Sequence, residues 1–310
     1  MRRLLPCLAL LLGAPALGHE FWLLPSKFHA ESGERVDVGL RVGMNFQGEP
    51  VARRPDRIVR FDALVGDMMM PVGGEAGAEP AGALVSGVAG LHVIAYQSGR
   101  SRITLEGAPF AEYLREEGLT EILAAREAEG IAGRTARELY SRCAKSLVLV
   151  GQDASATDRA VGLPLELVVA TPLRAIGVGG SVEALLLREG RPLAGVLVQA
   201  RREGSPGSTV SARTGEDGRA RLDIDGPGVW MLAAVHMVRA ALAPDDPDAA
   251  FEPDYESLWA TVTFEVESPG AAARATDAEP IAYPALDLVW QDEFNADGPP
   301  DPANWVHEIG

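Results

Sequence analysis

Several short segments of the chain have the composition and spacing of β-strands, and glycine and proline separate them. Residues 35–42 read Arg-Val-Asp-Val-Gly-Leu-Arg-Val, an alternation that puts polar and apolar side chains on opposite faces of an extended backbone. Further strand candidates cover residues 90–96, 180–187, 193–200, 221–224 and 228–236. Short strands at this spacing predict β-sandwich architecture.

The middle of the chain has a different composition. Residues 110–117 and 120–129 favour helix, and Leu139, Cys143 and Leu147 recur every four residues, which predicts a third helix over 135–146. We therefore expect a mainly β fold, with two β-sandwich domains of immunoglobulin or transthyretin type and a helical insertion between them.

The expected domain organisation follows from these changes in composition. It comprises a signal peptide (1–18), an N-terminal β-domain (19–107), the helical insertion (108–150), a second β-sandwich (151–267), a linker (268–285) and the start of a further domain (286–310).

The first residues predict export. Arg2 and Arg3 precede an apolar run over residues 4–12, and Ala16-Leu17-Gly18 has the small residues of a cleavage site. The run is too short to cross a bilayer, and no second long apolar segment follows it. We expect cleavage after Gly18, a mature chain that begins at His19 and has no transmembrane segment, and a periplasmic or secreted bacterial location.

Cysteine content and charge narrow the function further. Cleavage removes Cys7 and leaves Cys143, which has no internal disulfide partner and is expected to pack in the core. The formal net charge is −16, so phosphate backbones are repelled and nucleic acid is not an expected partner. Cations are the natural complement of such a surface.

Motifs spread over residues 19–267 carry a family resemblance. They begin with His-Glu-Phe-Trp-Leu at 19–23 and continue at 33–34, 48–50, 113–119, 137–145, 162–166 and 230–237. With them the chain resembles the exported family named domain of unknown function 4198. Relatives in that family are linked to cobalt and nickel uptake as periplasmic components. The resemblance implies a metal-related role, with a metal-transporter membrane component as partner.

Two narrower resemblances concern the second half of the chain. Residues 190–198 and 214–220 resemble Cna-B and carboxypeptidase-regulatory-like domains, which are transthyretin-like β-sandwiches without catalysis of their own. Residues 288–294 and 304–310 are similar to the opening strand of family 16 glycoside hydrolases, whose catalytic carboxylates are absent here. This resemblance implies a hydrolase domain cut short.

Three histidines are the candidate metal ligands. A mature N-terminal His19 would offer its α-amino group and its imidazole to one ion, a donor set that suits nickel, cobalt or copper. His92 and His236, each on an expected strand, are the candidate partners. The alternative interpretation makes them half-buried strand histidines bonded to the backbone. No close pair of His or Cys residues indicates an ordinary zinc site.

The sequence shows no nucleophilic elbow, phosphate loop or dinucleotide fingerprint, so we expect no catalytic residues, no organic cofactor and no enzyme activity. Our hypothesis is an exported accessory protein that binds or delivers a divalent transition metal. The alternative is a non-catalytic adhesion or carbohydrate-associated β-module ahead of a missing glycoside hydrolase domain.

Overall fold

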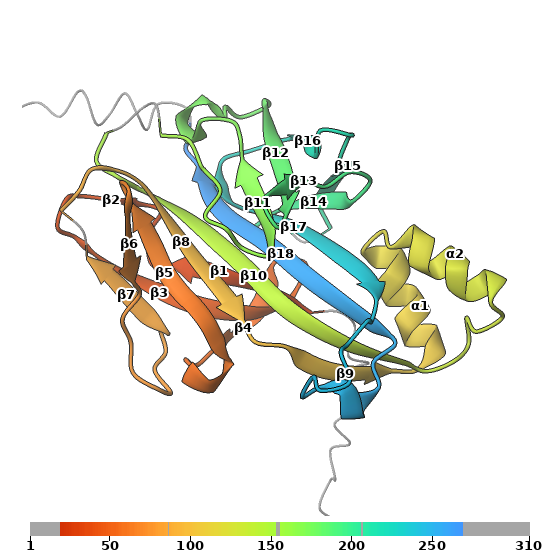
Figure 1. Ribbon diagram of the computed structural model, residues 1–310. Coiled ribbons are helices and arrows are strands. Elements are labelled where there is room, and N and C mark those ends of the chain that lie inside the picture. The colour runs from red at the N-terminus through yellow and green to blue at the C-terminus, as the bar shows by residue number, and fades with distance from the viewer. Residues whose placement is uncertain (1–18, 86, 153–155, 206, 269–310) are drawn as a thin grey trace, which may run out of the picture. The chain divides into compact units, whose positions relative to one another are not determined.

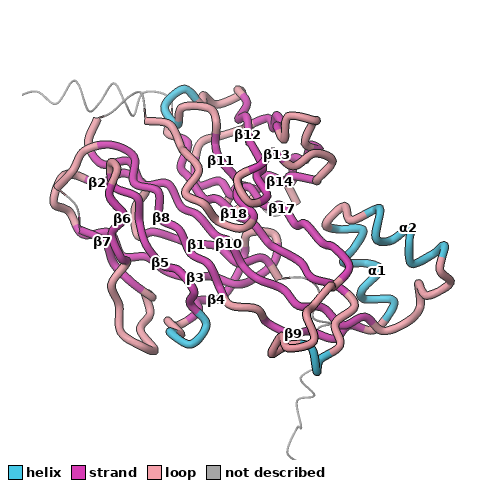
Figure 2. The backbone as a smooth tube through the Cα atoms, in the orientation of Figure 1, coloured by secondary structure: helices cyan, strands magenta, loops and turns pink. Residues whose placement is uncertain are grey.

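The computed structural model describes residues 19–268, apart from residue 86, residues 153–155 and residue 206. These residues belong to one compact unit. The expected signal peptide, nearly all of the linker and the hydrolase-like tail lie outside them. Three β-sheets and two α-helices make up the described chain (Figures 1 and 2).

The three sheets, here called A, B and C, divide the strands as follows. Sheet A contains β1 (Glu20–Pro25), β3 (Arg35–Met44), β4 (Gln47–Val51) and β7 (Gly82–Val85). Sheet C contains β11 (Leu165–Val169), β12 (Ser181–Arg188), β13 (Arg191–Pro192) and β16 (Arg219–Asp223). Sheet B runs in the order β15 (Thr209–Arg213), β14 (Leu197–Arg202), β17 (Gly228–Arg239), β18 (Tyr255–Val266), β10 (Ala136–Val150), β8 (Gly90–Ser98), β5 (Ile58–Val65) and β6 (Met68–Pro71). The short strands β2 (His29–Ala30) and β9 (Ser101–Leu105) also pair with β10.

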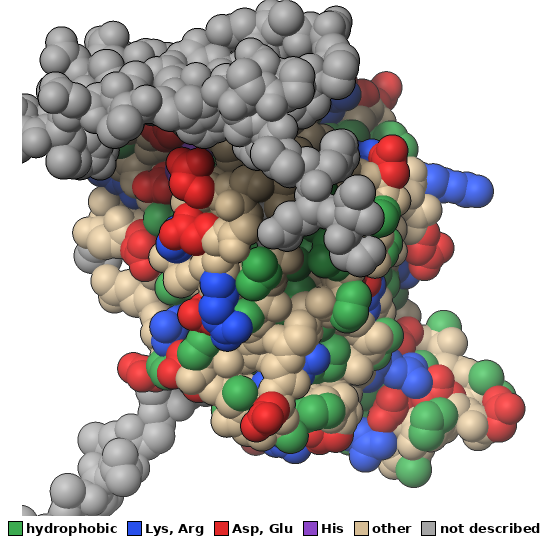
Figure 3. Space-filling model, turned by 90° about the vertical axis from the view of Figure 1, so that its left-hand side faces the viewer, with side chains coloured by type: hydrophobic (Ala, Val, Ile, Leu, Met, Phe, Trp, Pro, Cys, Tyr) green, Lys and Arg blue, Asp and Glu red, His purple; other side chains and the backbone are tan. Residues whose placement is uncertain are grey.

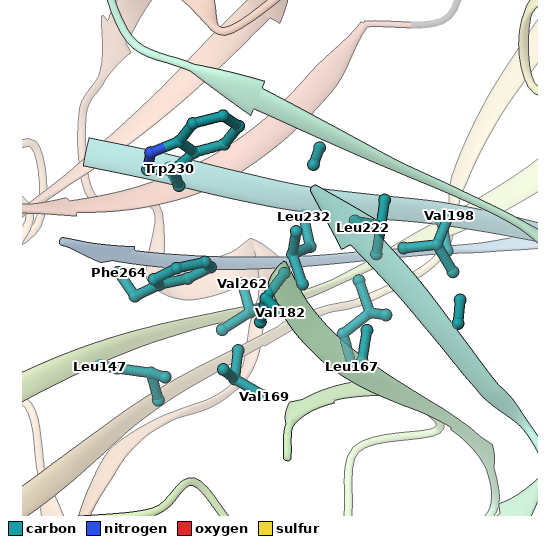
Figure 4. Packing of buried hydrophobic residues seen from close by; sticks show 14 of the residues in the cluster. Leu147, Leu167, Val169, Val182, Val198, Leu222, Trp230, Leu232, Val262 and Phe264 are labelled. Atoms are coloured by element: carbon teal, nitrogen blue, oxygen red, sulfur yellow. The ribbon is translucent and has the colours of Figure 1, made fainter. Parts of the chain in front are cut away.

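Sheet B is common to two hydrophobic cores, one against each of the smaller sheets. Ile94 and Val148 join the core that includes Val38 and Leu40 of sheet A. Their neighbours Val93 and Leu147 instead join the core that contains sheet C. Figure 4 shows this second core, whose labelled residues come from sheets B and C. Strands β8 and β10 are therefore buried on both faces, because consecutive side chains point in opposite directions. The mainly β sandwich fold expected from the sequence is confirmed.

The third expected helix is wrong, because residues 136–150 form β10, the longest strand of the described chain. The four-residue spacing of Leu139, Cys143 and Leu147 is compatible with a strand, since all three side chains lie on one face of an extended chain. A strand buried on both faces has no polar alternation to distinguish it from a buried helix. Only the first two-thirds of the expected insertion, before β10, contains helix.

The two expected helices are confirmed as α1 (Gly107–Glu116) and α2 (Thr120–Ala128). Phe110 and Tyr113 of α1 pack on Tyr255 and Trp259 of β18, with the Tyr113 and Trp259 rings stacked 5.5 Å apart. This small aromatic core fixes where α1 ends, beside β14 and β17.

A fully buried ion network holds the segment before β11 against β10. Lys145 Nζ lies 2.9 Å from Asp158 Oδ1 and 3.1 Å from Glu166 Oε1. Backbone N–H groups of Val161, Gly162 and Leu163 donate to Glu166, and that of Val169 donates to Asp158. Because these contacts replace the lost water, the three charges are tolerated in the interior.

No helix among the described residues is both long and apolar enough to span a membrane. The domain boundaries expected from the sequence stay a prediction, although the shared sheet B joins the two sandwiches by continuous strand pairing.

Candidate binding pocket

A polar pocket of about 240 Å³ lies where sheet A, the end of α1 and the edge of sheet B come together. Its lining residues are Glu20, Met44, Asn45, Glu116, Glu117, Gln199, Arg201 and Thr209. Three of these side chains are carboxylates and one is a guanidinium, so the pocket is predominantly acidic.

The floor of the pocket is a hydrogen-bonded group of buried side chains. Arg201 forms a close ion pair with Glu20, whose other oxygen accepts a 3.1 Å hydrogen bond from the Phe46 backbone N–H. Gln199 accepts from Arg201 and donates to the Glu116 carbonyl (3.0 Å) and to the Glu117 carboxylate (3.4 Å). The positive charge of Arg201 is thus held by Glu20, and Arg201 Nε is buried without a partner among the described residues.

A two-residue hairpin turn forms one rim of the pocket. Asn45 (φ 54°) and Phe46 (φ 58°) both adopt the left-handed conformation, as both central residues of a type I′ turn must. Phe46 is a bulky residue for this conformation, and its ring compensates by packing on Trp22 and Met231 in the core. Gly48, on the strand that follows the turn, leaves room for the Trp22 ring that packs on Phe46. A Cβ at Gly48 would lie 2.7 Å from that ring.

Glu117 has the most perturbed carboxyl group in the pocket. Burial first, and then the nearby negative charge of Glu20, raise the pKa of Glu117 to about 8 against the opposing effects of Arg201 and Arg142. The residue follows the last turn of α1, and Gly118 (φ +66°) then ends the helix. The helix C-terminus carries partial negative charge, which also favours a cation beside Glu117.

The three candidate histidines do not lie together. His19 is exposed and directly precedes Glu20 of the pocket. His92 is 1% exposed on β8, and its Nε2 lies 2.9 Å from the Val88 carbonyl oxygen. Burial lowers the pKa of His92, and the Val88 hydrogen bond opposes that shift.

His236 lies on β17, half-buried, in a neighbouring groove of about 140 Å³ between the α1–α2 junction and β14, which shares Glu117 with the acidic pocket. Burial lowers the pKa of His236, and Arg188 adds to this effect. The strand pairing sets His92 opposite Val148 and His236 opposite Leu258, which pairs with Ser141. Seven residues of β10 therefore separate the two histidines, roughly 23 Å along the sheet.

Other candidate donors are engaged elsewhere. His29 lies between Glu265 (3.1 Å) and Glu267 (3.2 Å), one on each ring nitrogen, so its nitrogens point to different groups. Asp246 and Asp248 pair with Arg100 and Arg102. Across the described residues, no three His, Cys, Asp or Glu side chains are grouped as a metal site would need.

Sequence reasoning did not identify most of this pocket. Two adjacent glutamates at the end of a helix give no local sign that Glu116 is exposed and Glu117 half-buried. Gln199 and Arg201 give no local signal, because they become neighbours of Glu20 only when β14 reaches the N-terminal sheet. The one usable signal is that Glu20 and Glu117 both lie in motifs of the family resemblance.

The fold and the pocket define a mainly β module with a small pocket lined by three carboxyl groups. The family model described as Domain of unknown function (DUF4198) matches residues 16–238, and the chain belongs to this family. No curated protein matches the chain. The match ends at Val238, earlier than the expected extent to residue 267.

Two solved structures show a distant likeness. One is the adhesin InvE of Yersinia pseudotuberculosis, 14% identical over 82% of this chain, with a TM-score of 0.18; the chain spans 61% of that adhesin. The other is the D0-D1 domain of Intimin, 11% identical over 79% of this chain and 97% of that one, also with a TM-score of 0.18. Scores this low describe backbones that do not superpose as one fold, so neither structure informs the function.

Proposed function

We propose that the protein is an exported, non-catalytic accessory module that binds a divalent transition metal, nickel, cobalt or copper, through a mature N-terminal His19. The observation that carries this proposal is the position of His19, exposed and one residue before the Glu20 of an acidic pocket. After cleavage at Gly18, the α-amino group and the imidazole of one residue would provide two nitrogen donors.

The acidic surroundings support a cation at this place. On the face drawn in Figure 3, acidic and basic side chains are interspersed. His92 is not included in this proposal, because its Nε2 is bonded to Val88 inside the core. A periplasmic location and delivery to a membrane transporter belong to the same proposal.

Mass mapping of the exported protein and metal titration test the proposal together. The mature chain should begin at His19, and nickel should bind wild type more tightly than His19→Ala by about tenfold or more, as loss of a chelating donor requires. His236→Ala serves as the matched control, since it removes an imidazole that lines the neighbouring groove and not the acidic pocket that follows His19. A different N-terminus, or equal nickel affinity in wild type and His19→Ala, would contradict the proposal.

A further inference from the structure

The acidic pocket has properties that a bare metal ion does not need. Its volume of about 240 Å³ is many times the roughly 10–15 Å³ that a single water requires. Its acceptors are spread around the wall, and no three acidic or imidazole groups among the described residues converge on one point. A ligand with several N–H donors matches this spread better than a single small ion does.

The charge balance of the wall selects a cationic ligand. Three carboxyl groups, those of Glu20, Glu116 and Glu117, line the pocket beside one guanidinium, that of Arg201, which is bonded to Glu20. A cation that binds there would ionise Glu117 and so meet an excess of negative charge. Arg142, which lies outside the lining, is stacked on the rings of Tyr140 and Trp259. Glu117 lines the cavity, and among the described residues its carboxylate accepts one hydrogen bond, the 3.4 Å contact from Gln199.

The uncharged lining residues define the rest of the ligand. Met44 offers an apolar, adaptable surface on one side, and Asn45 and Thr209 offer polar groups at the exposed rim. We propose that this pocket binds an organic cation, a protonated amine or guanidinium on a short alkyl chain, with its charged head paired to Glu117. His19, the proposed metal ligand, precedes Glu20 but is not among the residues that line this pocket.

The ionisation of Glu117 gives the proposal a second consequence. Burial, Glu20 and Glu116 raise the pKa of Glu117 to about 8, while Arg201 and Arg142 limit the shift. In the empty pocket the Glu117 carboxyl group therefore holds a proton at neutral pH. A bound cation favours the ionised carboxylate, so binding near pH 7 should release a proton.

Calorimetric titration of the mature protein with n-butylammonium, n-butylguanidinium and neutral n-butanol tests the charge requirement. The two cations should bind and butanol should not. Glu117→Gln should weaken cation binding by about tenfold or more, as removal of a charge-assisted hydrogen bond requires. Glu112→Gln, the same change on the exposed side of α1, should leave the affinity unchanged.

Two further measurements keep the test independent of folding defects and of the metal proposal. Thr209→Trp places a bulky side chain at the exposed rim and leaves all three glutamates of the pocket unchanged. It should also block binding. Titration in two buffers of different ionisation heat should show proton release with wild type and none with Glu117→Gln. His19→Ala should keep butylammonium binding even where it loses nickel.

A capped peptide with one lysine separates the two sources of such a cation. Binding of this peptide indicates a side chain of a partner protein, and binding of the free amine alone indicates a small molecule; both support the amine chemistry. Butanol binding as tightly as butylammonium, unchanged affinity in Glu117→Gln, or loss of amine binding in His19→Ala would overturn the proposal.

Discussion

Lys145 Nζ lies 2.9 Å from Asp158 Oδ1 with neither side chain more than 1% exposed, and this ion pair joins the longest strand to the segment that leads into sheet C. Glu166 completes the charge arrangement from the first strand of that sheet. The network holds two parts of the chain together and is not a ligand site. Its three charged groups are hydrogen-bonded to one another and to backbone N–H groups.

Lys145→Met should destabilise the protein by about 3–5 kcal/mol, because it leaves two buried carboxylates without their cation. Urea unfolding followed by tryptophan fluorescence measures the change. Arg159→Met is the control: it removes an exposed ion pair with Asp67 and should cost less than about 1 kcal/mol. Similar losses in the two variants would show that the network does not hold the sheets together.

Gly48→Ala should destabilise the β3–β4 hairpin by about 2 kcal/mol or more, because the new Cβ would lie 2.2 Å from the Val42 carbonyl oxygen and 2.7 Å from the Trp22 ring. Thermal unfolding is the readout. Gly73→Ala meets no atom within 4 Å and should change stability by less than about 1 kcal/mol. A Gly48→Ala protein as stable as wild type would mean that Trp22 and the turn can shift freely.

The stability of the protein should fall as pH rises toward 8. The pKa of Glu117 is raised from 4.5 to about 8 in the folded state, so between these values the folded protein binds more protons than the unfolded chain. Glu117→Gln should remove this part of the pH dependence and gain on the order of 1–2 kcal/mol relative to wild type above pH 8, after allowance for solvent screening.

Chemical unfolding at a series of pH values, in wild type, Glu117→Gln and Glu112→Gln, measures this effect. Parallel pH profiles for wild type and Glu117→Gln would show that Glu117 ionises normally. The Glu112→Gln profile should follow wild type, since that side chain is exposed on the same helix.

Cys143 should resist alkylation in the folded protein. Its side chain is 1% exposed, and burial raises the pKa of the Cys143 thiol to about 11, so very little reactive thiolate exists at neutral pH. Iodoacetamide labelling followed by mass spectrometry should modify the mature chain only in denaturant. Rapid labelling under native conditions would mean that β10 opens far more readily than a doubly buried strand should.

Elements with a clear hydrophobic period or a clear end could be predicted from the sequence alone. Alternation in residues 35–42 predicted β3, the apolar run at 228–236 predicted β17, and the composition of residues 110–117 and 120–129 predicted the helices α1 and α2. Cys143 was expected in the core, and it lies there. These features depend on residues that are close together in the sequence, so the sequence alone is enough to predict them.

The remaining features depend on contacts between segments that are distant in the sequence. Whether residues 136–150 form helix or strand depends on β8 and β18 lying on either side, since the four-residue spacing fits both conformations. The pocket depends on Glu20, Glu117 and Arg201 meeting from three distant segments. Hydrogen bonding and burial across such separations set the ionisation of Glu117, and no local pattern in the chain encodes that environment.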